Sequence, residues 1–195
     1  MAIVGLSRIY VAKYAAGSGT PTYSDGTLLA KAVEMSVELE SADDNNDYAD
    51  NEISESDTTF GGGTLTLTTD DLSQEGSALI LGITPSAVTG LTPEVKELVY
   101  DDDMVPPYLG AGSIIKKIKN GMAKWRAVVL PKVKFSVPSD SATTQGETIE
   151  WQHPEITANI YRDDSAKHRW KREANFDTEE DAAAYIKKLL NIAED

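Results

Sequence analysis

One stretch of the sequence, residues 104–138, contains no acidic residue, although the chain carries 32 of them. The same stretch holds seven of the 18 basic residues, so the rest of the chain has a net charge of 11 − 32 = −21. Segregated charge of this kind promotes self-association where unlike patches meet. It is equally compatible with a basic face on an otherwise acidic protein. The seven basic residues are Lys116, Lys117, Lys119, Lys124, Arg126, Lys132 and Lys134.

The basic stretch also has the pattern of strands joined by a tight turn. Asn120 and Gly121 form a dipeptide typical of two-residue β-hairpins, because both turn positions need a positive φ. After the turn, side chains alternate between those expected inside and those expected outside. Pro131 cannot donate to a strand ladder, so we expect it to interrupt the pairing or to lie at an edge. The pattern predicts a basic hairpin over residues 108–137.

Apolar and polar residues alternate over residues 32–40, and this pattern predicts a half-buried antiparallel strand. Its apolar row should face the core and its glutamates the solvent. The apolar row is Val33, Met35, Val37 and Leu39, and the other row contains Glu34, Glu38 and Glu40. Similar patterns predict strands over 4–14, 64–69, 95–101, 149–161 (broken near Pro154) and 167–173, whereas the Gly-, Ser-, Thr- and Pro-rich residues 15–31 predict a loop.

Two helices are expected. A short one should begin near Asp70 to Ser73 and end at Gly82. A longer C-terminal helix should begin with a capping box of Asp177 and Glu180, and its apolar stripe should dock on the sheet. The stripe comprises Ala182, Tyr185, Ile186, Leu189, Leu190 and Ala193.

Residues 40–57 contain eight acidic residues and no basic one. We therefore expect a long acidic loop over 41–59, mobile in an isolated chain because it has few large apolar side chains. Asp43, Asn45 and Asp47 are spaced like the start of a calcium loop. The later positions do not fit calcium, since Tyr48 stands where Gly is needed and Ser54 where Glu is needed.

Composition restricts the remaining classes of function. The chain has 195 residues and no Cys, which suits one domain and excludes disulfides and thiolate metal sites. A net charge of −14 argues against nonspecific DNA binding. No apolar run approaches the ~18 residues of a membrane span. His153 and His168 belong to no ligand or catalytic motif, so no cofactor, metal or catalytic residue is predicted.

The ordered set of segments resembles the major tail proteins, or tail tube proteins, of long-tailed non-contractile bacteriophages. The most specific stretch runs from Leu109-Gly110-Ala111-Gly112 through Asn120-Gly121 to Trp125-Arg126-Ala127-Val128-Val129-Leu130-Pro131-Lys132-Val133-Lys134-Phe135. Residues 4–12, 63–82, 144–151 and 176–186 are also similar to that family. Some members carry an additional immunoglobulin-like domain, and we expect none here, so residues 1–195 should form a single tail-tube domain.

The resemblance implies a mostly β (α+β) fold, with two packed β-sheets and a flanking C-terminal helix. It implies rings of six copies, stacked into a hollow tube in the virion after assembly in the host cytoplasm. The implied partners are other copies of the chain, the tape measure protein, tail initiator and terminator proteins, and genomic DNA passing transiently through the lumen. Membrane insertion is not expected.

The resemblance also implies functions for two groups of charged residues. Glu34, Glu38 and Glu40 are candidates for lining the lumen, where like charge would prevent phosphate contacts. Candidates for contacts between subunits are Asp43, Asp44, Asp47, Asp50, Lys116, Lys117, Lys119 and Lys124. Two alternatives remain open: a β-sandwich adhesin or other virion accessory binding module, and a hydrolase with catalytic carboxylates.

Overall fold

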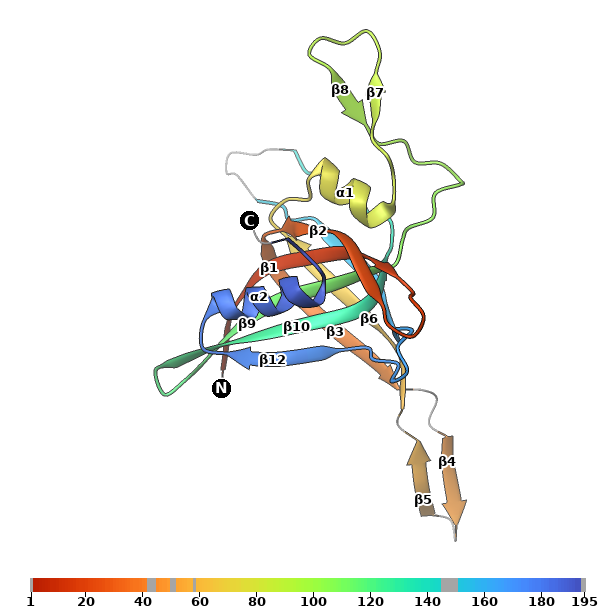
Figure 1. Ribbon diagram of the computed structural model, residues 1–195, viewed down its shortest axis with the longest axis vertical. Coiled ribbons are helices and arrows are strands. Elements are labelled where there is room, and N and C mark those ends of the chain that lie inside the picture. The colour runs from red at the N-terminus through yellow and green to blue at the C-terminus, as the bar shows by residue number, and fades with distance from the viewer. Residues whose placement is uncertain (1, 42–44, 50–51, 58, 145–150, 194–195) are drawn as a thin grey trace.

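A large antiparallel sheet organises the chain, and the computed structural model describes residues 2–41, 45–49, 52–57, 59–144 and 151–193 (Figure 1). The strands follow the order β2-β1-β9-β10-β11-β6-β3, and β12 also pairs with β10. The bounds are β1 Ala2–Ala15, β2 Thr22–Ala30, β3 Ala32–Ser41, β6 Phe60–Thr69, β9 Leu109–Lys119, β10 Met122–Phe135, β11 Glu155–Tyr161 and β12 Arg172–Phe176.

Two small ribbons and two helices complete the described part of the chain. Figure 1 shows the ribbons projecting from opposite ends of the β-rich body, with helix α1 beside the upper ribbon. The ribbon strands are β4 Asn45–Ala49 with β5 Glu52–Asp57, and β7 Ser86–Val88 with β8 Val95–Glu97. The helices are α1 Gln74–Leu81 and α2 Glu179–Leu189.

The main hydrophobic core lies between the two halves of the curved sheet. Leu65 and Leu67 of β6 are both 1% exposed, and they share one cluster with Ile9 of β1 and Val133 of β10. Ile80 of α1 belongs to the same cluster, so this helix contributes to the core. The architecture is a β-sandwich-like α+β fold, which confirms the fold class predicted from the sequence.

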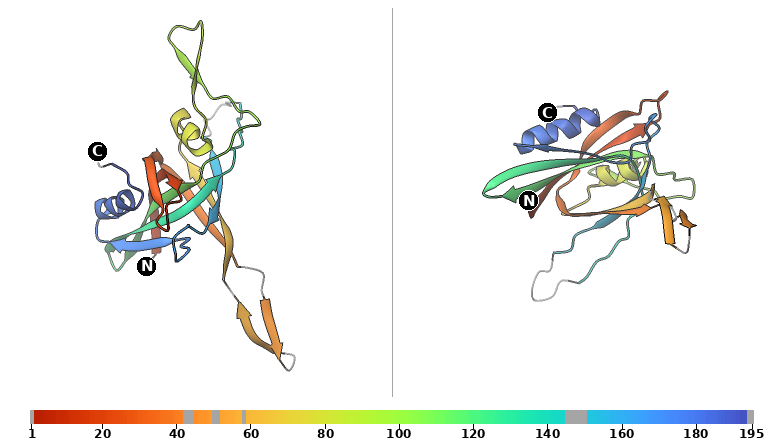
Figure 2. Two further views of the ribbon diagram at one scale, coloured as in Figure 1. Left: turned by 45° about the vertical axis from the view of Figure 1, so that its right-hand side comes forward. Right: turned by 90° about the horizontal axis from the view of Figure 1, so that it is seen from below.

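A second cluster lies on the outer face of the sheet, where α2 covers β1, β9 and β10 (Figure 2). The helix approaches the sheet closely because two glycines lie beneath it. A Cβ atom at Gly112 would lie 2.6 Å from Cγ2 of Ile186, and one at Gly110 would lie 2.6 Å from Cδ2 of Leu190. The predicted docking of the C-terminal helix on the sheet is confirmed, although Ala193 at the end of the predicted stripe is exposed.

The basic hairpin forms as predicted. Asn120 and Gly121 have φ values of 53° and 76°, and β9 and β10 pair on either side of them. Pro131 lies at a register shift between Leu130 and Val133. Residues before the shift pair with β12, and those after it pair with β11. Pro131 therefore marks the position where β10 changes its neighbour.

The ends of both helices follow local capping chemistry. Ser73 accepts a hydrogen bond from the backbone N–H of Gly76 at 3.1 Å, and Gly82 ends α1 with a φ of 71°. The predicted capping box of α2 is wrong by one residue. Thr178 is the N-cap and accepts from the N–H of Asp181 at 3.1 Å, since a hydroxyl there reaches the first free donors.

Several predicted boundaries differ from the structure. The loop predicted over 15–31 contains β2, an edge strand in which only Leu29 is buried, so its sequence shows little alternation. The strand predicted over 95–101 is limited to β8. The strand predicted over 167–173 begins at Arg172, because residues 163–169 form a turn centred on Asp163. Of the segment 149–161, residues 149–150 lie outside the described residues and the strand begins after Pro154.

The acidic segment 41–59 is not a loop throughout. Residues of β4 and β5 pair as an antiparallel ribbon, with Asp47 opposite Glu55 and Tyr48 opposite Ile53. The prediction failed because acidic, weakly alternating sequence carries little strand signal, whereas backbone pairing does not depend on side-chain type. Of the acidic residues predicted to contact other subunits, Asp43, Asp44 and Asp50 lie outside the described residues, and only the backbone of Asp47 is described.

Candidate assembly surfaces

The tip of the basic hairpin is a three-stranded surface of β1, β9 and β10. Lys116 is exposed, and its ammonium lies 5.5 Å from the ring centroid of Trp125 on the neighbouring strand. Lys117 is partly exposed and is opposite Lys124 in the register. Lys119 ends β9, and only its backbone is described. The structure thus brings the predicted lysines together near one hairpin end.

Part of this positive charge is neutralised within the chain. Lys124 forms an ion pair with Asp177, and Arg126 lies 3.8 Å from Glu173 of β12. A hydrogen bond from Lys171, with the charges of Lys171, Arg126 and Lys117, lowers the pKa of the Glu173 carboxyl. The separation of charge seen along the sequence is therefore smaller in the folded chain. Within the described residues, Lys116 and Lys117 have no carboxylate within 4.0 Å.

The glutamate row lies on β3, whose one strand partner among the described residues is β6, so β3 forms an edge of the large sheet. Glu34, Glu38 and Glu40 are all exposed. The predicted apolar row is only half correct. Met35 and Val37 pack against the core, but Val33 and Leu39 are each 46% exposed.

A register shift between Ala32 and Glu34 explains the first of these exposures. The extra residue, Val33, interrupts the alternation, and Ala32 packs against the core in its place. Near the other end, Leu39 is opposite Gly63, which offers no side chain to cover it. The glutamates therefore face solvent in the single chain, and their place in a lumen remains a prediction.

The acidic ribbon joins the body beside an aromatic stack. The rings of Phe60 and Trp170 are 4.6 Å apart and nearly parallel, and Arg162 lies over the same Phe60 ring at 5.9 Å. Arg162 also donates a hydrogen bond to the carbonyl of Phe60. Phe60 begins β6, so this stack holds the strand at the position where the acidic segment ends.

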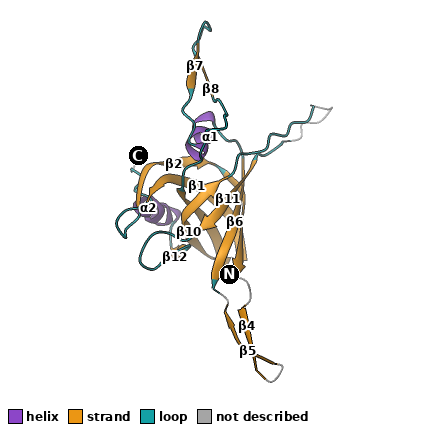
Figure 3. Cartoon of the chain, turned by 90° about the vertical axis from the view of Figure 1, so that its right-hand side faces the viewer, coloured by secondary structure: helices purple, strands orange, loops and turns teal. Residues whose placement is uncertain are grey.

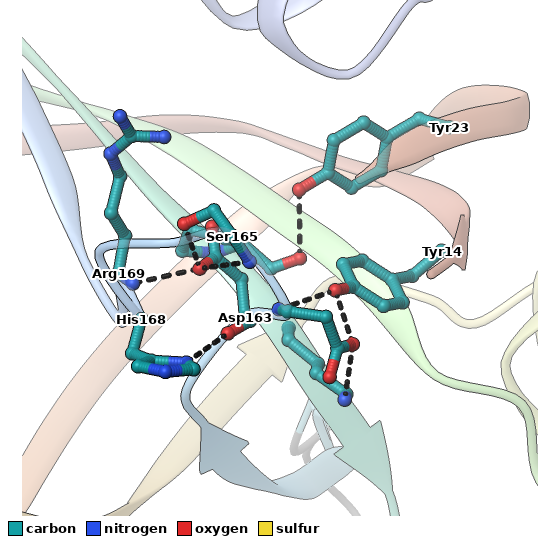
Figure 4. A network of polar contacts seen from close by, with 9 residues as sticks. Tyr14, Tyr23, Asp163, Ser165, His168 and Arg169 are labelled. Carbon is teal, nitrogen blue, oxygen red and sulfur yellow. Dashed lines mark hydrogen bonds and ion pairs between the residues drawn. The ribbon is translucent and has the colours of Figure 1, made fainter. Parts of the chain in front are cut away.

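A polar network that was not predicted from the sequence holds the β11–β12 connection against the sheet (Figure 4). Asp163 is 4% exposed, and its Oδ1 accepts from the backbone N–H and the hydroxyl of Ser165 and from the N–H of Arg169. Nδ1 of His168 lies 3.3 Å from the Asp163 carbonyl. An Asp followed two residues later by Ser is a known turn signal and could have identified this turn.

Two tyrosines connect this turn to the strands. The Tyr14 hydroxyl donates to Asp164 at 2.6 Å, and Lys132 donates to the same carboxylate at 2.8 Å. Burial and the Asp164 hydrogen bond raise the pKa of Tyr14 to about 12. Burial also raises the pKa of Tyr23, whose hydroxyl donates to the Pro131 carbonyl at 2.9 Å. The chemistry of these contacts is that of a structural clamp.

The clamp predicts a loss of stability at alkaline pH. Both tyrosines hold their proton more tightly in the folded chain than in the unfolded chain, where the pKa is about 10. Their stabilising contribution is complete below pH ~10 and is lost as pH rises through the folded values. We expect the melting temperature to fall less between pH ~10 and ~12 in a Tyr14→Phe, Tyr23→Phe variant than in the wild type. Tyr100→Phe, at an exposed tyrosine, is the control and should retain the wild-type slope. An identical slope for all three proteins would contradict the prediction.

No protein-family model matches the chain, and a search of curated proteins found no match. Within the described residues, no group of three or more His, Asp or Glu side chains could hold a metal ion. None of the helices in the described part of the chain is long and apolar enough to cross a membrane. His153 and His168 both lie outside the strands and helices.

Proposed function

We propose that this chain is the structural subunit of a bacteriophage tail tube. Copies assemble into rings of six, the rings stack into a hollow conduit in the virion, and the conduit delivers the genome. Assembly takes place in the host cytoplasm around a tape measure protein, between tail initiator and terminator proteins. Genomic DNA is a transient passenger, and the chain itself performs no catalysis.

The observation that carries this proposal is the set of unlike projections around one β-sandwich-like body. An acidic ribbon, β4–β5, extends from one end, and the basic hairpin tip of β9–β10 extends in another direction (Figure 1). A subunit that contacts its neighbours head to tail needs two different surfaces that fit each other. Oppositely charged projections meet this requirement, whereas a binding module needs only one recognition surface.

The exposed strand edges support the same proposal. Strands β2 and β3 lie at the two ends of the sheet order, so each has one edge without a strand partner among the described residues. Such edges favour uncontrolled pairing in a free monomer. In an assembled ring they are covered by adjacent subunits. The glutamates of β3 would then be repeated by every copy in the ring.

Electron microscopy and sedimentation of the purified chain test the proposal. We expect hollow rings or tubes that grow with protein concentration. Reversing two charges at the hairpin tip, Lys116→Glu with Lys117→Glu, should leave folding intact but prevent assembly, because the tip would then repel acidic surfaces. Lys96→Glu with Lys167→Glu is the matched control, since it makes the same change in net charge elsewhere. A wild-type protein that stays monomeric at every concentration would favour the binding-module alternative.

A further inference from the structure

An open groove lies between the edge strand β2, the middle of β1 and the end of α2. Its volume is about 320 Å³, within the ~300–1,000 Å³ range of pockets that hold small ligands or side chains. Apolar atoms of Leu28 and Ile192 line it, and Leu28 is 50% exposed. The side chains of Arg8 and Lys187 add positive charge to the same lining. The groove thus combines apolar and polar lining atoms with two cationic side chains, of which Arg8 is paired with Glu179.

Backbone strain accompanies this groove. Arg8 has a φ of 53°, in the left-handed region that residues with a Cβ rarely adopt, and a register shift separates Ser7 from Ile9. The bulge redirects the Arg8 side chain, and Glu179 of α2 holds its Nε at 3.3 Å. Strained residues of this kind occur preferentially at functional sites. The bulge and the Glu179 contact therefore set the orientation of the Arg8 side chain in the groove.

The other wall of the groove contains a close contact between β2 and the residues that follow α2. A Cβ atom at Gly26 would lie 2.4 Å from Cγ1 of Ile192, so only glycine lets the chain end pack against β2 without displacement. Ile192 is partly buried by this contact. The position of Ile192 relative to Arg8 is therefore set by the fold of the single chain.

Trp151 is the most exposed large hydrophobic residue of the described chain, at 82%. It lies in the connection between β10 and β11, where residues 136–154 contain three acidic residues and neither Lys nor Arg. Gln152, next to it, donates a hydrogen bond to Thr143 across this connection. Trp is enriched among the residues that dominate binding energy at interfaces.

We propose that the groove is the docking site for the Trp151 segment of a second copy of this chain. The indole suits the apolar atoms of Leu28 and Ile192, and Trp is the aromatic side chain that cations such as Arg8 and Lys187 attract most strongly. The acidic character of the donating segment complements the cationic lining. The inference rests on the proposed self-assembly and names one of its contacts.

Geometry requires the two partners to be different chains. The described parts of the β10–β11 connection leave the body on the side opposite α2 (Figures 2 and 3). One copy therefore donates Trp151 on one side and receives a neighbour's Trp151 on the other. Such a contact is head to tail and either closes into a ring or continues as a filament.

Site-specific cross-linking tests the contact directly, because the chain has no cysteine of its own. Thr27→Cys lies in the exposed part of the groove lining, and His153→Cys lies beside Trp151 without removing it. The two single-cysteine proteins are mixed, allowed to assemble and treated with a short bismaleimide. We expect a cross-linked dimer that contains one copy of each. Val105→Cys, at a residue 73% exposed, replaces Thr27→Cys as the control and should yield little of this product.

Substitution of Trp151 supplies a second measurement. Trp151→Ala should raise the concentration needed for assembly roughly tenfold or more, while Trp151→Phe should recover part of the loss. The melting temperature of both monomers should remain that of the wild type, because the side chain is 82% exposed. Normal assembly of Trp151→Ala would overturn the inference.

The outcomes separate this contact from the proposed function. Tubes or rings without the Thr27–His153 product above the control level would overturn the contact and leave the tube proposal standing. The cross-linked product without rings or tubes would support the contact and contradict the tube. Absence of both would contradict both proposals.

Discussion

Replacing Ile186 with Asp should leave little soluble, folded protein. Ile186 is 0% exposed, and its side chain lies directly above Gly112, so the new carboxylate would be buried without a partner. A buried unpaired charge costs several kcal/mol, and substitutions of this type fall in the range above about 4 kcal/mol. Small domains have a total stability of only ~5–15 kcal/mol. Helix α2 would therefore detach from the sheet, and the second hydrophobic cluster would be exposed to solvent.

Ala184→Asp is the matched control for this prediction. Ala184 is exposed on the same helix, so the substitution introduces the same charge into solvent. It should cost only the difference in helix propensity, about 0.5 kcal/mol. Soluble yield and thermal unfolding followed by circular dichroism compare the two variants. If Ile186→Asp unfolds cooperatively at the midpoint of the control, α2 is not an integral part of the fold.

The second large effect concerns the glutamate row of β3. In assembled particles, Glu34→Lys, Glu38→Lys and Glu40→Lys together should slow genome ejection by roughly tenfold or more at low salt, because each new lysine can bind a DNA phosphate. The three side chains are exposed in the single chain, so folding should be unaffected. Added salt should restore the rate, since phosphate contacts weaken steeply as salt rises.

The measurement is the ejection rate from assembled particles across a range of salt concentrations. A control with Glu94→Lys, Glu97→Lys and Asp102→Lys makes the same change in net charge at exposed positions away from β3. Particles of the control should eject like the wild type. Normal ejection by the β3 variant at low salt would place the glutamate row outside the lumen.

The candidate surfaces were only partly predictable. The lysines were identified because seven basic residues fall within one stretch, and charge composition is visible without a structure. Their partners were not, since Asp177 and Glu173 are 53 and 47 residues from Lys124 and Arg126 in the sequence. The groove could not be predicted at all. Its lining comes from β1, β2 and the end of α2, and no local pattern links these three segments.

The sequence by itself determined the elements whose cause is local. The Asn120–Gly121 turn, the alternation of β6 and the apolar stripe of α2 each depend on neighbouring residues, and all three are present in the structure. Only the tertiary structure decided the features that need distant backbone to pair. These include the edge strand β2, the acidic β4–β5 ribbon and the bulges at Arg8 and Val33. The physical reason is that strand pairing satisfies backbone groups whatever side chains they carry, so weakly patterned segments become strands only when a partner strand is within reach.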